Sequence, residues 1–583
     1  MKSVRDVDPS GRHDPAEAAS APVPPARRPG NPKCPCGTSI THTPGKRPRV
    51  YCSEACKKRG QRAAKAATEA AKKSSRTKKG RLGTSTTEFR SPLRPAETSA
   101  GVRGEPERGE PLSEETKAKV GAARRARRYQ ARRTLWRVTT DKACRGCGRT
   151  VMDPDAGVVL AQTTEGVAVT LGLLTCGRIW LCPVCSAKIR HGRAQEITSA
   201  VVAWLQQGGT AYLVTFTARH AAAHRLADLM DAIQGTRADA EAGIKRRPGA
   251  YQRLITGAAW AGDKRRAANP EGIRGRVGYI GMIRATEITV GVANGWHPHI
   301  HAIVFVGGRT TGERGDKRVT GTFTPSKESA AELEQHFRGV WTRHLAKVDP
   351  DFKPSQKHGV DFKPLKTERD AKNMGEYIAK LQEGSRTINP ANEVARGDLK
   401  QGRYGNQTPF QILDRIGDLL GGMTEEDAEG HGSLEWCLRI WAEYEVATAG
   451  RRAIEWTRYL RPLLGLAGGD TEDDDLDMLF ELDGANGEFR AGVHVEERTW
   501  GKLTGRALDL AVLEAVEGEE VDMPTITELA VAAGSRSGAV RLLSPAEVAD
   551  AWEAILTTLA ARREAAAERR RRAAEESPNT TQE

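Results

Sequence analysis

The spacing of apolar residues is regular over the central part of the chain and predicts both strands and helices. Runs of β-branched and aromatic residues predict strands at residues 211–217, 279–290, 296–306 and 359–363. Apolar residues three or four positions apart predict helices at residues 222–233, 251–266, 327–347 and 368–381. The sequence Ala293-Asn294-Gly295 predicts a hairpin turn between the second and third strands. We therefore expect an α+β fold in which helices cover an antiparallel sheet.

The remainder of the chain divides by composition. Residues 1–33 contain several prolines and no apolar period, which predicts a disordered tail. The predicted organisation continues with a small four-cysteine module at 34–62, a basic linker or arm at 63–133, a second cysteine module at 134–195, the α+β core at 196–400, a helical extension at 401–465, and an acidic break with a mainly helical C-terminal region at 466–583.

Charge and composition narrow the classes of function. The 583 residues include 90 basic and 75 acidic side chains, a net charge of +15, which favours a polyanionic partner such as nucleic acid. No apolar run approaches the roughly 18 residues of a membrane span, so we expect no membrane protein. The N-terminus lacks the apolar core of a secretory signal, and we expect a cytoplasmic protein.

Three histidines lie on one predicted strand, in the sequence Trp296-His297-Pro298-His299-Ile300-His301. Because side chains alternate along a strand, His297, His299 and His301 share a face. Folding back at the turn brings Glu287 opposite residues 299–301. Two imidazoles and a carboxylate suit a divalent ion such as Mg²⁺ or Mn²⁺. The alternatives are ordinary histidines and a Glu287 paired on the surface with Arg284 or a lysine.

The cysteines form two groups. Their members are Cys34, Cys36, Cys52 and Cys56 in the first, and Cys144, Cys147, Cys182 and Cys185 in the second. In a reducing compartment, four closely spaced thiolates suit a closed, structural Zn²⁺ site better than disulfides or free thiols. Cys176 is a fifth candidate that can replace one ligand of the second group. Cys437 stands alone among apolar residues of a predicted helix, and we expect it in the core.

A run of arginines ends the predicted arm. The candidates for phosphate contacts are Arg124, Arg125, Arg127 and Arg128. Such a segment is either a DNA-binding arm that becomes ordered on contact or a solvated linker, and the sequence leaves both open.

The predicted helix at 368–381 carries a candidate nucleophile. Tyr377 and Lys380 are three residues apart and share a helical face. A phenol is a poor nucleophile alone, but beside a metal-bound phosphate and a lysine it can attack phosphorus. The alternative is an ordinary packed tyrosine. Tyr404, in a loop shortly afterwards, is the competing tyrosine.

The order of these motifs resembles that of the HUH endonuclease superfamily, and in particular the rolling-circle replication initiators of actinobacterial plasmids. The resemblance covers roughly residues 140–465. It rests on the strand motif Val214-Thr215-Phe216-Thr217, the histidine motif, the Tyr-x-x-Lys helix, and the stretches 176–185 (CGRIWLCPVC), 407–410 (QTPF) and 441–456 (WAEYEVATAGRRAIEW).

The resemblance implies an HUH nuclease core that nicks one strand of a plasmid origin and stays bound to the 5′ end through Tyr377. It implies that His299 and His301 bind the metal, that Lys380 positions phosphate or metal, and that His297 occupies an additional histidine position. We see no phosphate loop of the Gly-Lys-[Ser/Thr] type, so unwinding is expected from a host helicase.

One feature departs from a related group of initiators, in which a glutamate four residues before the tyrosine is the base for a second, hydrolytic cleavage. Asn373 occupies that position here, and the adjacent Glu376 points about 100° away from Tyr377 on a helix. Other functions compatible with the sequence are an HUH relaxase or transposase, although relaxases usually place the tyrosine before the histidines, and a non-enzymatic zinc-dependent regulator that binds DNA.

Overall fold

The computed structural model describes residues 114–237, 245–263, 265, 269–311, 318–356, 358–367, 369–371, 406–423, 432–466 and 488–576. All of them belong to one compact unit, Pro106–Glu583.

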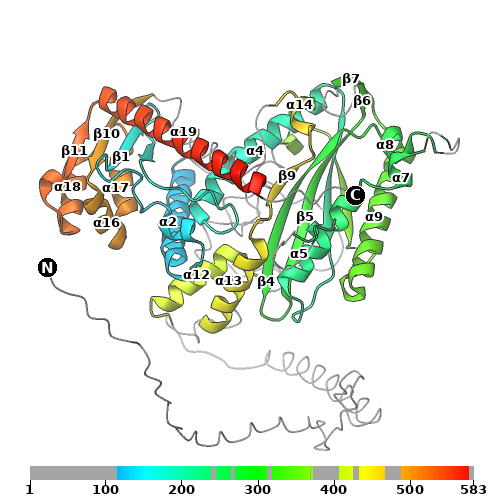
Figure 1. Ribbon diagram of the computed structural model, residues 1–583, viewed down its shortest axis with the longest axis horizontal. Coiled ribbons are helices and arrows are strands. Elements are labelled where there is room, and N and C mark those ends of the chain that lie inside the picture. Colours follow the sequence, from blue (N-terminus) through cyan, green and yellow to red (C-terminus); the bar gives the residue numbers. More distant parts are fainter. Residues whose placement is uncertain are drawn as a thin grey trace, which may run out of the picture. The chain divides into compact units, whose positions relative to one another are not determined.

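The central element is a five-stranded sheet with the strand order β8-β3-β5-β4-β9 (Figure 1). Every pair of neighbours is antiparallel. Its strands are β3 (Thr210–Thr217), β4 (Gly281–Gly291), β5 (Gly295–Val306), β8 (Val360–Leu365) and β9 (Ile454–Trp456). The predicted α+β organisation, an antiparallel sheet with helices, is confirmed for the described residues, and the predicted strands at 211–217, 279–290, 296–306 and 359–363 are all present.

The hairpin β4–β5 is the longest pairing and has an uninterrupted register from Gly281 opposite Phe305 to Gly291 opposite Gly295. Gly295 has a φ of +70°, and a Cβ there would lie 2.6 Å from the Cα of Ala222. A side chain at this position would therefore be strained and would collide with the chain that follows β3. The predicted hairpin turn is confirmed.

One face of the sheet is covered by helices. Ile300, Ala302 and Val304 point to this face and are fully buried. On the neighbouring strand, the ring of Phe216 contacts Phe337 and Trp341. The helices and short strands between β3 and β8 are α5 (Leu226–Gln234), α6 (Ala250–Arg253), α7 (Ala258–Ala261), α8 (Gly272–Arg276), β6 (Gly308–Thr311), β7 (Arg318–Thr322) and α9 (Lys327–Val348).

Two of the predicted helices differ from those observed. The helix predicted at 251–266 is wrong as one element, because it is divided into α6 and α7. Gly257 and Gly262 on either side of α7 have φ of +91° and +77°, which a continuing right-handed helix does not allow. The helix predicted at 222–233 begins only at Leu226, after the loop that packs on Gly295.

A second sheet joins two segments that are far apart in the sequence. Its order is β11-β10-β1-β2, again antiparallel. The strands are β1 (Val158–Thr163), β2 (Ala168–Leu171), β10 (Phe489–Val495) and β11 (Val540–Leu543). The loop expected between the second group of cysteines thus pairs with the C-terminal region. The described part of that region, residues 488–576, is mainly helical as predicted, but β10 and β11 were not predicted.

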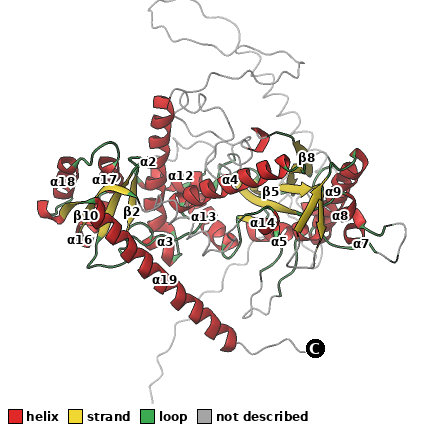
Figure 2. Cartoon of the chain, turned by 90° about the horizontal axis from the view of Figure 1, so that it is seen from above, coloured by secondary structure: helices red, strands yellow, loops and turns green. Residues whose placement is uncertain are grey.

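Helices complete the unit around both sheets. The C-terminal ones are α16 (Glu497–Gly505), α17 (Asp509–Val516), α18 (Met523–Ala532) and α19 (Pro545–Glu576). Val548 of α19 is fully buried against the second sheet, and Figure 2 shows the helix extending beyond it. Among the described residues, the remaining α-helices are α2 (Glu114–Val138), α3 (Lys142–Gly146), α4 (Pro183–Gln206), α12 (Pro409–Leu420), α13 (Leu434–Thr448) and α14 (Leu460–Leu463).

Candidate metal centres

The first candidate centre lies on the face of the central sheet opposite to Ile300 and is built by the β4–β5 hairpin. Glu287 is directly opposite His299 in the register, and His301 is opposite Ala285. Directly paired residues point to the same face, and residues two apart on a strand do so as well. The pairing therefore brings Glu287, His299 and His301 together, as the sequence predicts.

The three side chains form a compact, buried cluster. One carboxylate oxygen of Glu287, Oε2, lies 2.7 Å from Nε2 of His299 and 3.2 Å from Nε2 of His301. Each of the three residues is 4% exposed. Potential ligand atoms from all three lie within 4.8 Å of one another. The predicted alternative of a surface Glu287 paired with Arg284 is wrong: Glu287 is buried, and Arg284 pairs with Glu455.

The electrostatics favour an ionised carboxylate in this cluster. Burial alone would raise the pKa of Glu287, but the charges and hydrogen bonds of His299 and His301 hold that pKa well below its usual range. Thr215, which is opposite His301 on β3, has its hydroxyl 3.1 Å from Nδ1 of that ring. A partner at Nδ1 orients the imidazole and leaves Nε2 to face Glu287.

The donor set fits a divalent cation. Two imidazole nitrogens and a carboxylate oxygen converge, and the buried Nδ1 of His299 has no hydrogen-bond partner among the described residues. A ring without a second partner is free to adopt the tautomer in which Nε2 accepts a metal. These residues leave coordination positions open for water or phosphate oxygens.

His297, the third predicted histidine, is not one of the converging ligands. It is half-buried, and its ring stacks on that of His220 with centroids 4.4 Å apart. His220 follows β3 by three residues and places Nδ1 3.1 Å from the carbonyl oxygen of Asn294 in the hairpin turn. Sequence reasoning missed His220, because only the pairing of β3 with β5 brings that loop to the hairpin.

The second candidate centre consists of four buried cysteines: Cys147, Cys176, Cys182 and Cys185. The sulfur of Cys147 lies 3.7 Å from that of Cys182 and 3.6 Å from that of Cys185, and Cys176 is 3.7 Å from Cys185. The fifth candidate, Cys176, thus belongs to the group. Cys144 is buried beside it but is not one of the four.

The surroundings of this cluster favour a thiolate at Cys147 more than at its neighbours, because hydrogen bonds to the other cysteines raise the pKa of Cys176 and burial raises the pKa of Cys182. Hydrogen bonds from Cys176, Cys182 and Cys185 hold the pKa of Cys147 well below its ordinary value. Cys182 is also the N-cap residue of α4, a helix of 24 residues that includes Cys185. Four converging thiolates are the donor set of a closed structural zinc site, and these residues fit that ion.

The other predicted residues have different surroundings. Arg125 forms an ion pair with Glu517, and Arg127 forms one with Asp414, so both contact acidic residues of the same chain. Arg124 and Arg128 lie on the same helix, α2. Their predicted role in DNA binding stays a prediction. Cys437 is fully buried in the core, as expected.

Several predicted residues lie outside the described part of the chain. They are Tyr377, Lys380, Asn373, Glu376 and Tyr404 of the tyrosine region, and Cys34, Cys36, Cys52 and Cys56 of the first cysteine group.

Comparison with known proteins identifies relatives of this chain. It is 59% identical to "Protein rep" of Streptomyces lividans over 418 aligned residues. This alignment covers 70% of this chain and 91% of that protein. It is 51% identical to the "Neomycin resistance protein" of Streptomyces cyanogenus over 427 aligned residues, and that alignment covers 70% of this chain and 95% of the relative. No family model and no solved structure matches. The chain belongs to the family of the Streptomyces Rep protein.

The helices were also compared with the length and hydropathy of a membrane span. None of those in the described ranges is both long and apolar enough to cross a bilayer.

Proposed function

We propose that this protein initiates plasmid replication by the rolling-circle route, as an HUH-type endonuclease that nicks one strand of the origin. The observation that carries the proposal is the Glu287–His299–His301 cluster on adjacent antiparallel strands, in a chain that belongs to the family of a Rep protein.

His299, His301 and Glu287 would hold Mg²⁺ or Mn²⁺ at this site. When bound, the ion polarises the scissile phosphate and neutralises developing charge. Thr215 orients the ring of His301 through Nδ1, and the covered reverse face of the hairpin keeps both strands rigid. His297, supported by His220, would border the path of the single strand next to the ligands.

Tyr377 is the proposed nucleophile. Its phenolic oxygen would attack the phosphorus and form a phosphotyrosine at the 5′ end, while the P–O3′ bond breaks and a free 3′-OH is released for priming. Lys380 would hold the phosphate. The phosphotyrosine conserves the energy of the broken bond, so the reverse transfer closes a circle without an energy cofactor. Unwinding would be supplied by a host helicase.

Structural Zn²⁺ is the second proposed cofactor. Cys147, Cys176, Cys182 and Cys185 would hold one ion, and Cys34, Cys36, Cys52 and Cys56 would hold another. Neither role leaves an open position for a substrate. The basic residues of 63–133, apart from the buried Arg132, would add contacts to the phosphates of origin DNA.

The test is a nicking assay on a supercoiled plasmid with the cognate origin, in the presence of Mn²⁺. We expect a nicked circle with protein attached to the 5′ end. Tyr377→Phe removes only the phenolic oxygen, so it should bind the origin and form no adduct. Binding without nicking by the unmodified protein would instead support a DNA-binding regulator, and a nucleotide mapped to Tyr404 would move the nucleophile to that residue.

A further inference from the structure

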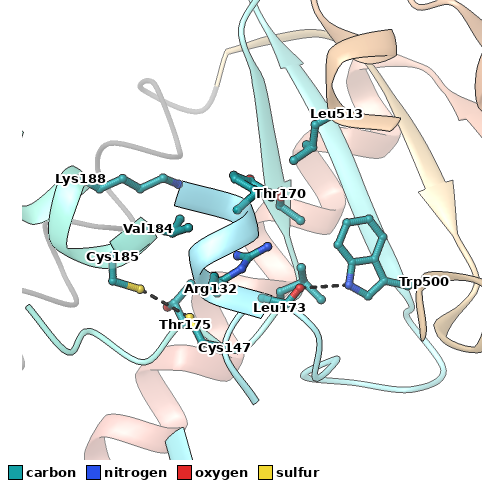
Figure 3. Close-up of a pocket in the computed structure, with 12 residues that line it drawn as sticks. Arg132, Cys147, Thr170, Leu173, Thr175, Val184, Cys185, Lys188, Trp500 and Leu513 are labelled. Atoms are coloured by element: carbon teal, nitrogen blue, oxygen red, sulfur yellow. Dashed lines mark hydrogen bonds between the residues drawn. The ribbon is translucent and has the colours of Figure 1, made fainter. Parts of the chain in front are cut away.

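An arginine, Arg132, lies beside the four converging cysteines and has no role in the zinc site proposed above. Arg132, on α2, lines a small pocket of about 40 Å³ together with Cys147, Cys185, Lys188, Trp500 and Leu513. Figure 3 shows Arg132 between the two cysteines and Trp500. Cys147 and Cys185 belong to the cysteine centre, whereas Trp500 and Leu513 belong to the hydrophobic core of the second sheet.

Arg132 is deeply buried and yet charged. It is 5% exposed, and its guanidinium donates to Asp509, which is fully buried, at 3.0 Å. Burial disfavours the charge, but Tyr129, Cys147 and Asp509 raise the pKa of Arg132 above its ordinary value. The guanidinium also lies over the rings of Tyr129 and Trp136.

The backbone around the centre is shaped for this contact. Gly148 directly follows Cys147, has a φ of +73°, and a Cβ there would lie 2.1 Å from a guanidinium nitrogen of Arg132. The backbone carbonyl oxygens of Cys147 and Gly148 also accept hydrogen bonds. The indole N–H of Trp136 donates to the first, and the indole N–H of Trp500 donates to the second. A residue other than glycine would displace the arginine from the cysteine turn.

A count of local charges indicates what balances Arg132. Arg133 also donates to Asp509, so two guanidinium groups share one carboxylate and leave one positive charge. The remaining charge lies beside the cysteine turn, where Arg132 is buried, and an unbalanced charge in a buried site is costly. Four thiolates around Zn²⁺ carry two net negative charges, and Arg132 would offset one of them.

We propose that Arg132 is a positioning residue that compensates the charge of a metal–tetrathiolate centre and, through Asp509, ties that centre to α17 and the second sheet. The inference rests on the proposed zinc site. Metal occupancy then governs how firmly the C-terminal segment 488–576 is held on α2, because losing the ion removes what holds the four sulfurs together beside Arg132 and weakens the arrangement that orients Arg132 toward Asp509.

Metal affinity provides the first test, with Co²⁺ as the probe because its thiolate charge-transfer absorption reports sulfur ligands. The full-length chain would carry Cys34→Ser and Cys52→Ser, so that only the second group of cysteines contributes. Arg132→Met is compared with Arg133→Met, which also loses a contact to Asp509 but does not line the pocket. We expect affinity for Co²⁺ to fall about 10- to 100-fold in Arg132→Met and to stay within about twofold in Arg133→Met. Arg132→Lys, which keeps the charge, should lie between Arg132→Met and the parent.

The outcomes separate the two proposals. If the parent chain binds no Co²⁺, or if Cys176→Ser leaves the sulfur absorption unchanged, the zinc site itself is wrong. If the parent binds Co²⁺ and the two arginine variants lose equal affinity, the zinc site stands and the role of Arg132 is overturned. If circular dichroism shows that Arg132→Met does not fold, Arg132→Lys is compared with Arg133→Lys instead. Equal losses of Co²⁺ affinity in these two variants would again overturn the role of Arg132.

The proposed tie to the second sheet has its own measurement. Hydrogen exchange of the parent chain is followed before and after removal of the metal with a chelator. We expect the amides of α17 and β10 to exchange at least about tenfold faster without metal, because their contact with the centre is weakened. Faster exchange confined to residues 142–150 and 174–188 would show that the metal orders only its own ligand segments and would overturn the tie.

Discussion

The histidine centre (Glu287, His299 and His301) and the cysteine centre (the four converging cysteines) differ in how far apart their residues lie along the chain. Glu287, His299 and His301 all come from one hairpin, within a span closed by a three-residue turn. The cysteines come from the turn after α3, the loop after β2 and the start of α4. Between Cys147 and Cys176, β1 and β2 form an antiparallel pair, and β1 also pairs with β10, more than 300 residues later. A local pairing rule therefore assembles the first centre, whereas the second depends on the folding of the whole unit.

The comparison implies that the two centres should fail differently when a ligand is removed. His301→Ala should lower the nicking rate about 1000-fold, since it removes a proposed ligand of the proposed catalytic ion, and should change the melting temperature little. Nicking is measured on an origin oligonucleotide over a range of Mn²⁺ concentrations. The exposed His358, mutated to Ala, is the control. Near-normal nicking by His301→Ala in the presence of chelator would mean that the histidines bind no catalytic metal.

Cys176→Ser should show the reverse behaviour. We expect a loss of one bound zinc per chain and a decrease of at least about 4 kcal/mol in the free energy of unfolding, because the binding energy of a structural ion is part of the folding energy. Cys144→Ser is the matched control and should keep the zinc, since Cys144 is not one of the four converging cysteines. Zinc content and urea unfolding are the measurements. Equal losses in both variants would indicate that Cys144 is a ligand after all.

The ion pair between Arg127 and Asp414 lies away from both centres, and the titration of its carboxylate provides a third comparison. Burial raises the pKa of Asp414 to about 6, although Arg127 opposes that shift. The folded protein then binds a proton more tightly than the unfolded chain, so stability is greater below the ordinary pKa of 3.8 and falls as the pH rises through 6. The decrease is at most about 3 kcal/mol. Asp414→Asn should abolish this part of the pH dependence in urea titrations between pH 4 and 7. An unchanged profile would exclude Asp414 as its source.

Thr215→Val should have the smallest effect. It removes the hydrogen bond to Nδ1 of His301 while keeping the shape of the side chain. We expect about tenfold weaker Mn²⁺ activation with little change in the rate at saturating Mn²⁺, because the ring loses orientation but remains a ligand. Thr217→Val, one position along the same face and opposite His299, is the control. A lower rate at saturating metal would indicate that Thr215 acts on the substrate directly.

The difference between the centres also explains which predictions hold. The strands at 279–290 and 296–306, their turn, and the convergence of Glu287 with His299 and His301 follow from a period of two residues and one short turn. Because these rules act between residues that are close in sequence, the structure that they produce can be predicted from the sequence. The division of the helix predicted at 251–266 reflects backbone angles at Gly257 and Gly262 that composition alone does not reveal.

Long-range pairing decided the rest. The spacing of the cysteines leaves open whether Cys144 or Cys176 joins Cys147, Cys182 and Cys185, because both lie close enough in sequence. The choice follows from β1, which pairs with both β2 and β10, so that Leu174 after β2 returns to hydrogen-bond with Gly148 in the turn after α3. Similarly, the sequence leaves open whether the arginine run is a DNA-binding arm or a linker, and only the fold shows that Arg125 pairs with Glu517 and Arg132 with Asp509. By itself the sequence determined the residue types of both centres and the geometry of the histidine hairpin. Only the tertiary structure decided which cysteines converge and which arginines are buried, because those choices depend on contacts between segments that no local period connects.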